Sequence, residues 1–192
     1  MSRQYFAETV TWATVAGTAV ANTTTETILI PNPTIGGNFM QEGRCLRIRG
    51  FFAYGTTATP TLTLALRWGG VAGTVIAKSA ANVMTSAVGG GASMTATGNI
   101  DIVIQTRSNG SAGTLMTNGI VDIFTSTAGT AGTVTNYGMT MPIVSGSTGG
   151  TTPVAVTADL TADTALALTA TWGTANAANS IQLINYSIEA LN

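Results

Sequence analysis

Side chains that could do acid–base or metal chemistry are few in this sequence. Histidine is absent from all 192 residues. This excludes Ser-His-Asp and Cys-His nucleophilic arrangements and most catalytic zinc sites. Paired carboxylates are the remaining route to catalysis, because one can act as an acid while the other acts as a base or nucleophile. The eight carboxylates are Glu8, Glu26, Glu42, Asp101, Asp122, Asp159, Asp163 and Glu189.

Two pairs of these carboxylates have a spacing that a site could use. Asp159 and Asp163 flank a short turn and could ligate calcium, but the segment has no EF-hand pattern. An Asp that bonds its own backbone in a solvated turn is the simpler interpretation. Asp101 and Asp122 fall on the off-core phase of two expected strands, where cross-strand ion pairing is favoured over catalysis. The available partners are Arg47, Arg49 and Arg107. We therefore expect no enzyme, no metal and no cofactor.

The one basic cluster is Arg44, Arg47 and Arg49. On a strand, the last two project from one face about 7 Å apart. They could bind a phosphate or an acidic partner, although interface salt bridges or a solvated sheet face are favoured. Cys45 is the single cysteine. It can form no intrachain disulfide, and a free cysteine is usually a small buried hydrophobic residue.

The charge content argues against nucleic-acid and membrane partners. Only 8% of residues are charged and the net charge is −1, against about 25% charged residues in ordinary soluble domains. Phosphate contacts need a basic patch, which seven scattered basic residues do not supply. No apolar run reaches the roughly 18 residues that a membrane helix needs. The first ten residues have no signal-peptide pattern, so we expect synthesis in the cytoplasm.

Alternation of apolar and small polar residues, with turn residues at short intervals, predicts a β protein. The expected strands are 24–30, 44–54, 60–68, 98–107, 114–124, 152–157, 163–172 and 180–191, with a short extra strand at 74–78. A bulge is expected at Asn118-Gly119, because glycine inside a strand pattern often marks one. The alternation slips near Ile184 and Asn185, which indicates a second bulge or burial of both faces.

The shared phase within each strand predicts the core. Its expected members are Leu46, Ile48, Phe52, Leu62, Leu64, Leu66, Ile100, Ile102, Ile104, Leu166, Leu168 and Ile181. Residues 62–69 resemble residues 166–173, and both stretches end in Trp-Gly. We interpret Trp68 and Trp172 as closing the core, with an aromatic binding platform as the alternative.

About eight main strands in one chain of this length suit an antiparallel double-sheet β-sandwich of the jelly-roll kind. An immunoglobulin-like or three-sided sandwich is the alternative. Residues 24–192 are expected to form this single domain. Residues 1–23 are expected to be an N-terminal attachment arm, with an extra edge strand as the alternative.

Two long stretches, 79–100 and 123–158, carry no charged residue but contain many apolar residues. Loops of that kind are expected to pack on their own sandwich or on a neighbouring subunit. Together with the arm and the basic strand they supply the candidate interface residues. These are Tyr5, Phe6, Trp12, Arg47, Arg49, Met84, Met94, Tyr137, Met139 and Met141.

The stretch TTETILIP at 24–31 leads into GRCLRIRG at 43–50 and GTTATPTLTL at 55–64. Near the end stand LTATW at 168–172 and NSIQL at 179–183. Over most of its length the chain resembles the small Thr/Gly/Ala-rich structural proteins of tailed bacteriophages. The resemblance implies a virion protein, most like a jelly-roll capsid decoration (cement) protein, and it implies no active-site residues.

The leading hypothesis is thus a homo-oligomer, expected to be a trimer, that binds the major capsid protein. It would be located on the capsid surface of the virion after synthesis in the bacterial host cytoplasm. The alternative is a receptor-binding or head-binding module of a phage tail fibre. The third hypothesis is an enzyme that uses carboxylates.

Overall fold

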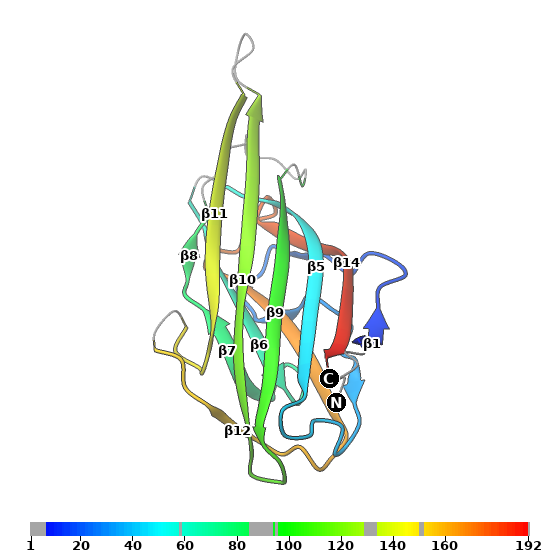
Figure 1. Ribbon diagram of the computed structural model, residues 1–192. Helices are drawn as coiled ribbons and strands as arrows, with labels where there is room; N and C mark the ends of the chain where they lie inside the picture. Colours follow the sequence, from blue (N-terminus) through cyan, green and yellow to red (C-terminus); the bar gives the residue numbers. More distant parts are fainter. Residues whose placement is uncertain are drawn as a thin grey trace.

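The computed structural model describes residues 7–57, 59–84, 94, 96–128, 134–149 and 152–191, and for 125–128 and 134–138 it describes the backbone alone. All regular secondary structure among these residues is β-strand, which confirms the predicted all-β class (Figure 1). In this part of the chain, no helix is long and apolar enough to cross a membrane.

The sheet has 14 strands, and all neighbouring strands are antiparallel. They are β1 (Ala7–Trp12), β2 (Val20–Ala21), β3 (Thr27–Ile28), β4 (Thr34–Ile35), β5 (Cys45–Gly55), β6 (Thr61–Trp68), β7 (Thr74–Ser79), β8 (Asn82–Val83), β9 (Ala96–Ser108), β10 (Gly113–Ala128), β11 (Val134–Ser145), β12 (Val156–Ala158), β13 (Thr164–Trp172) and β14 (Ser180–Leu191).

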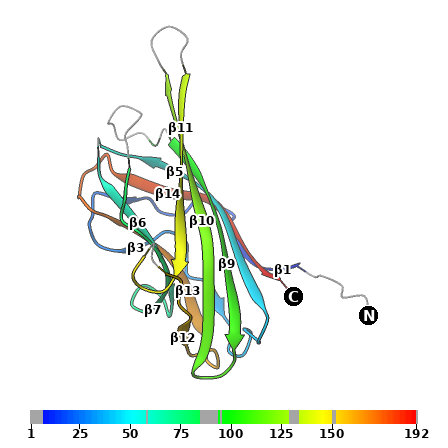
Figure 2. The same ribbon diagram turned by 60° about the vertical axis from the view of Figure 1, so that its left-hand side comes forward.

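One hydrogen-bonded path runs in the order β1-β14-β5-β9-β10-β11-β7-β6-β13-β3. The sheet curls along this path into a half-barrel, so that β6, β7 and β13 lie behind β5, β9 and β10 (Figures 1 and 2). The junction is the pairing of β11 with β7, from Ile143↔Ser79 to Ser145↔Ala77. Because this junction makes the path continuous, the expected division into two sheets of about eight strands is not confirmed.

The hydrophobic core fills the inside of the curl. All twelve residues that the strand phases predict for the core are buried. The alternation is clearest in β5 and β9, where one face lies against the core while the other faces outward. In β13 both faces are buried over Leu166–Ala170.

The two Trp-Gly strands, β6 and β13, are neighbours in the sheet. Their antiparallel register puts Trp68 and Trp172 at opposite ends of the pair, and both rings are buried. The Nε1 of Trp172 donates to the Val20 carbonyl at 3.1 Å, and that of Trp68 donates to the Asp159 carbonyl at 2.9 Å. Both side chains therefore close the core, as predicted.

Much of the segment predicted as an arm is an edge strand. β1 pairs with β14 from Ala7↔Leu191 to Trp12↔Ser187, and β2 pairs with the start of β14. β1 and β2 thus agree with the alternative, an extra edge strand on the sheet, and the role of residues 1–23 as an attachment arm stays a prediction. Residues 1–6 lie outside the described residues.

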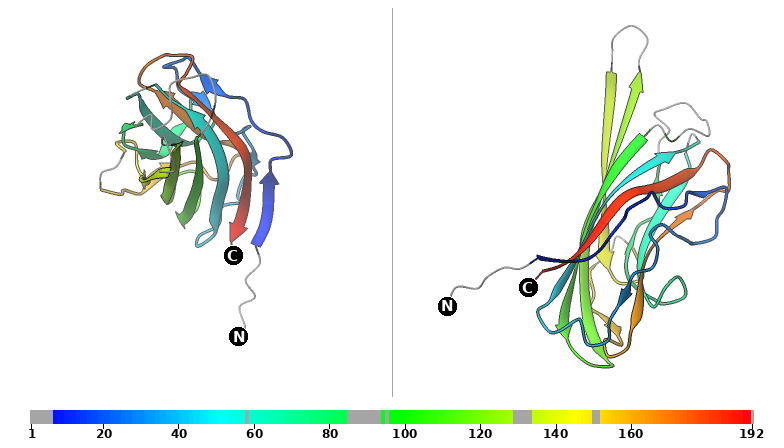
Figure 3. Two further views of the ribbon diagram at one scale, coloured as in Figure 1. Left: turned by 90° about the horizontal axis from the view of Figure 1, so that it is seen from above. Right: turned by 90° about the vertical axis from the view of Figure 1, so that its right-hand side faces the viewer.

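Residues 13–44, which we call the N-terminal strap, cross the open side of the half-barrel (Figure 3). The strap bonds to both ends of the curl, since Gly17 N donates to Leu183 O and Leu29 N donates to Leu168 O, each at 2.8 Å. Five of its apolar side chains are buried in the core, namely Val20, Leu29, Ile30, Ile35 and Met40. The strap thus seals the core where no ladder closes it.

The bulge predicted at Asn118-Gly119 is wrong. β10 keeps its register with β9 there, and the shift occurs between Thr114 and Leu115. Gly119 has a different role, because a Cβ at this position would lie 2.7 Å from the Asp101 carbonyl oxygen. Position 119 therefore favours glycine, because the backbone of β9 leaves no room for a side chain there.

The charge-free stretch 123–158, expected as a loop, contains all of β11 and β12. β11 pairs along its whole length with β10. The other stretch, 79–100, contains β8 and the start of β9, and much of it lies outside the described residues.

Candidate interaction surface

One side of β14, β5, β9, β10 and β11 faces away from the core, and no described strand covers it (Figures 1 and 3). We call this side the outward face. Cross-strand register aligns its central row, which is Ser187, Arg49, Asp101, Ile120 and Pro142. The face is thus built by the off-core phase of five strands: β9, β10 and β11 follow one another along the chain, whereas β5 and β14 come from distant parts of it.

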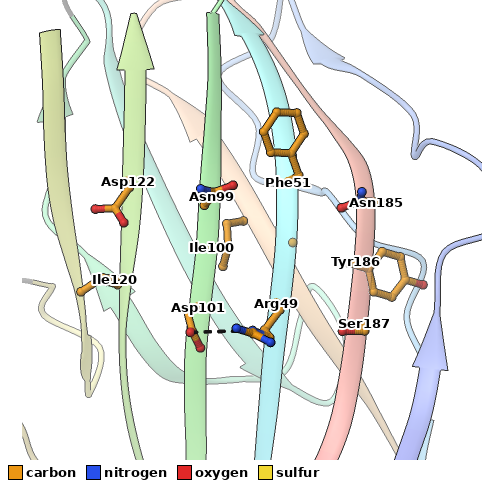
Figure 4. Close-up of a pocket in the computed structure, with 11 residues that line it drawn as sticks. Arg49, Phe51, Asn99, Ile100, Asp101, Ile120, Asp122, Asn185, Tyr186 and Ser187 are labelled. Atoms are coloured by element: carbon orange, nitrogen blue, oxygen red, sulfur yellow. Dashed lines mark ion pairs between the residues drawn. The ribbon is translucent and has the colours of Figure 1, made fainter. Parts of the chain in front are cut away.

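The centre of the outward face is hollowed. A shallow hollow of about 600 Å³ lies over β14, β5, β9 and β10, with Phe51 and Tyr186 at one side and Asp122 at the other (Figure 4). A smaller hollow of about 380 Å³ adjoins it over β9, β10 and β11, and the two share Asp101 and Ile120. Together they form one continuous depression across the middle of this face.

Large apolar side chains are exposed on the outward face and at its edge. Ile120 is 45% exposed and Phe124 is 46% exposed, both on β10. Trp12, which is aligned with Ser187 on the edge strand β1, is 62% exposed. Exposed apolar groups that gather on one surface mark interaction sites more reliably than single ones do.

Arg47 and Asp101 form the main ion pair of this face. The guanidinium donates from Nε to Oδ1 at 2.9 Å and from a terminal nitrogen to Oδ2 at 2.5 Å. These hydrogen bonds lower the pKa of Asp101, and they outweigh desolvation, which acts in the opposite direction. The predicted cross-strand pairing of Asp101 is confirmed, and a carboxylate held in this way is a poor proton donor.

Arg49 and Asp122 are less well satisfied. The Nε of Arg49 lies 4.0 Å from Asp101 Oδ2, and its side chain is 56% exposed. Asp122 accepts a hydrogen bond from Thr140 Oγ1 at 2.6 Å. The expected pairing of Asp122 with an arginine is wrong, because β10 is separated from the arginines of β5 by the whole of β9.

The remaining candidate pair, Asp159 and Asp163, lies in the turn between β12 and β13 and forms hydrogen bonds with the backbone. Asp159 Oδ1 accepts from both the backbone N and the Oγ1 of Thr161, and this lowers the pKa of Asp159. Asp163 Oδ1 accepts from Gly37 N at 2.8 Å. The interpretation of Asp159 as a backbone-bonded turn residue is confirmed. In the part of the chain that the structure describes, no three Cys, Asp or Glu residues cluster in a way that could hold a metal.

A polar cluster that the sequence analysis missed lies on the opposite side of the half-barrel. Arg67 on β6 donates to both oxygens of Glu26 in the strap, at 2.5 and 2.6 Å, and also to the Gly73 carbonyl. Thr169, on β13, donates to the same carboxylate at 2.5 Å. The hydrogen bond from Arg67 is the largest cause that lowers the pKa of Glu26. This cluster fastens the strap to the sheet.

The predicted interface residues have different positions. Arg47, Arg49 and Trp12 lie on the outward face or its edge. Met84 and Met141 are 1% and 0% exposed. Both are therefore corrected to core positions, because no partner can reach them.

Met94 is half-buried, and Met139 is partly buried against the core. Tyr5 and Phe6 lie outside the described residues, and for Tyr137 only the backbone is described. Cys45 is half-buried rather than buried, and desolvation raises the pKa of its thiol.

The sequence analysis missed Ile120 and Phe124 as surface residues. The signal was present, because both share the off-core phase of Asp122 on β10, opposite to the buried Val121 and Ile123. No family model matches the chain, and no curated protein matches it.

Proposed function

We propose that the chain is a non-enzymatic virion structural protein that binds the surface of a phage capsid as a decoration protein and stabilises the head. The observation that carries the proposal is the outward face, with its hollowed centre and its exposed Trp12, Ile120 and Phe124. An uncovered sheet face with large exposed apolar side chains favours a protein that works through contact with other proteins. The resemblance of the sequence to phage structural proteins supplies the setting.

The carboxylates support a non-catalytic role. Asp101 is held by Arg47, Asp159 by its own turn and Glu26 by Arg67. Each of these groups has a partner that stabilises its charged form, whereas a catalytic acid needs a raised pKa. We therefore assign them to folding and to surface charge.

The strand order supports a jelly roll as the finer description of the fold. The order β1-β14-β5-β9 on one side and β3-β13-β6-β7 on the other is that of two four-stranded sheets joined by Greek-key connections. β10 and β11 then continue the first sheet around one side to β7. Viral capsid proteins use this architecture, which is consistent with a position on the virion.

A tail-fibre module is the second candidate, and the β10–β11 ribbon favours it. Its last four pairs, from Thr125↔Tyr137 to Ala128↔Val134, lie beyond Phe124↔Thr97, where the pairing with β9 ends (Figure 1). A two-stranded ribbon is marginal in water by itself. One that projects from the body is therefore suited to insertion into another structure.

Copy number in the virion tests the two proposals. Quantitative mass spectrometry of purified virions of the phage that encodes the chain gives the number of copies per particle. Hundreds of copies, and rebinding of the purified protein to heads that lack it, support decoration. A few tens of copies support a tail-fibre module, and absence from the virion refutes both.

A further inference from the structure

The outward face carries both signs of charge and the exposed apolar side chain of Ile120. We propose that this face is the contact between copies of the chain, and that Arg49 of one copy pairs with Asp122 of another. The inference deepens the proposed function, because it rests on the protein being a homo-oligomer. It names the surface and the pair of charges that hold the copies together.

The first argument is that two charges of the face are loosely engaged within one copy. Arg47 engages both oxygens of Asp101, at 2.9 and 2.5 Å, and is also aligned with Glu189 on β14. Arg49 lies 4.0 Å from the Asp101 carboxylate, and its side chain is 56% exposed. Asp122 has a hydroxyl partner, Thr140, and no ion pair among the described residues. Arg49 and Asp122 are therefore available to charges of another molecule.

The second argument is distance. Asp122 is aligned with Asn99, which places it two strands from β5 and one step along the strand from the row of Arg49. Strand spacing and rise put the two Cα atoms about 12 Å apart. In Figure 4, the Arg49 side chain points toward Asp101, and Asp122 lies beyond β9. Arg49 and Asp122 are therefore too far apart to pair within one copy, and an opposite charge from another molecule can approach each of them more closely.

The third argument favours a second copy over a foreign partner. In a contact between identical chains, any residue pair that forms once forms again with the roles exchanged. A face that offers one loosely engaged cation and one loosely engaged anion is complementary to itself. The apolar side chain of Ile120, which is 45% exposed, lies on β10 next to Asp122 along the strand and is buried by the same contact. Apolar groups beside charged ones are usual in protein interfaces.

Charge reversal tests the pairing. We would measure self-association by sedimentation equilibrium for the wild type, Arg49→Asp, Asp122→Arg and the double reversal. Each single reversal puts like charges together, so the dissociation constant should rise about 10-fold or more. The double reversal restores opposite charges and should return to within about threefold of the wild type. An equimolar mixture of the two single variants should also associate more tightly than either variant alone.

Glu42→Arg is the matched control, because it reverses an exposed carboxylate on a loop away from the outward face. Its association should equal that of the wild type. Circular dichroism and melting temperature check that each variant folds. If a reversal does not fold, Arg49→Gln and Asp122→Asn remove the same charges without adding new ones, and each should still weaken association.

The result that overturns the inference is a wild type that is monomeric, or single variants that associate as tightly as the wild type. The inference is also overturned if the double reversal does not recover the affinity of the wild type. If the two residues did not pair with each other, the losses of affinity from the two single reversals would add. Capsid rebinding by the wild type is measured separately. If the wild type binds heads but the charge-reversal variants self-associate as tightly as the wild type, the inference is wrong and the proposed function is unaffected.

Discussion

The Glu26–Arg67 cluster fastens the N-terminal strap to the sheet, and its removal is expected to loosen the fold. Glu26→Ala deletes a carboxylate that accepts three short hydrogen bonds, two from Arg67 and one from Thr169. Charged hydrogen bonds contribute about 1.5–3 kcal/mol each when buried. The two partners are 20% and 26% exposed, so water replaces part of this interaction.

We therefore expect Glu26→Ala to lower the free energy of unfolding by about 2–3 kcal/mol, which for a chain of this size lowers Tm by roughly 5–10 °C. The assay is urea and thermal unfolding at fixed protein concentration, since any oligomer makes Tm depend on concentration. A double-mutant cycle with Arg67→Ala should give a coupling of about 1–2 kcal/mol. Glu42→Ala, an exposed carboxylate, is the control and should change stability by less than about 0.5 kcal/mol.

The same cluster predicts a pH dependence. The pKa of Glu26 is lowered in the folded chain, so its contribution is fully present above the ordinary carboxyl pKa and is lost as the pH falls through the folded value. The stability difference between the wild type and Glu26→Ala should therefore shrink as the pH falls from 7 toward 3. A coupling near zero, or a difference that does not change with pH, would refute our reading of the cluster.

The remaining predictions concern the core and the edge. Leu64→Ala, at a fully buried site, should cost about 2–5 kcal/mol in denaturant unfolding; a loss below roughly 0.5 kcal/mol would contradict our strand phase. Gly98→Ala places a Cβ 2.2 Å from the Phe52 ring, so we expect a loss of about 1–3 kcal/mol, and a neutral result would mean that the ring has room to move. Tyr54→Phe removes a buried hydroxyl that has no hydrogen-bond partner among the described residues, so stability should stay the same or rise, and a loss above about 1 kcal/mol would reveal a further partner. Deletion of residues 2–12 removes β1 and exposes the edge of β14. This deletion should lower Tm and promote aggregation, whereas an unchanged Tm and intact solubility would favour the attachment arm.

The sequence predicted the central strands well, because one buried face enforces strict alternation. β14 occupies the predicted residues 180–191, and its register shifts between Leu183 and Asn185, which confirms the bulge expected near Ile184. β5, β6, β9 and β13 lie within two residues of their predicted bounds. Each of them packs its buried phase against the opposite side of the curl.

The elements that the sequence did not predict are those whose environment is set by tertiary contacts. β1 has a weak pattern, and the open edge of β14 recruits it. β11 was missed because Gly138 and Pro142 break its pattern, although β10 pairs with it throughout. Strand 24–30 is reduced to β3, since the strap bends inward to bury Leu29 and Ile30.

On the candidate surface, the sequence predicted single residues but not their grouping. It placed Arg47 and Arg49 on one strand face and Asp101 off the core, and the register joins them. It gave no sign that Ile120 lies in the same row, because the order of strands in the sheet is not written in the spacing along the chain. The Glu26–Arg67 pair was hidden for the same reason, since the partners are separated along the chain and meet through the strap.

The pairing of β14 has a consequence for how the protein is made. β14 is synthesised after β1 to β13, yet it lies between β1 and β5 and is a ladder partner of both. Until it leaves the ribosome, β5 has an open edge, β1 has no ladder partner and the strap has nothing to bond at Leu183. A chain that stops short of residue 180 therefore exposes strand edges, which are prone to aggregation. Chains without β14 are therefore expected to aggregate rather than to reach the folded state.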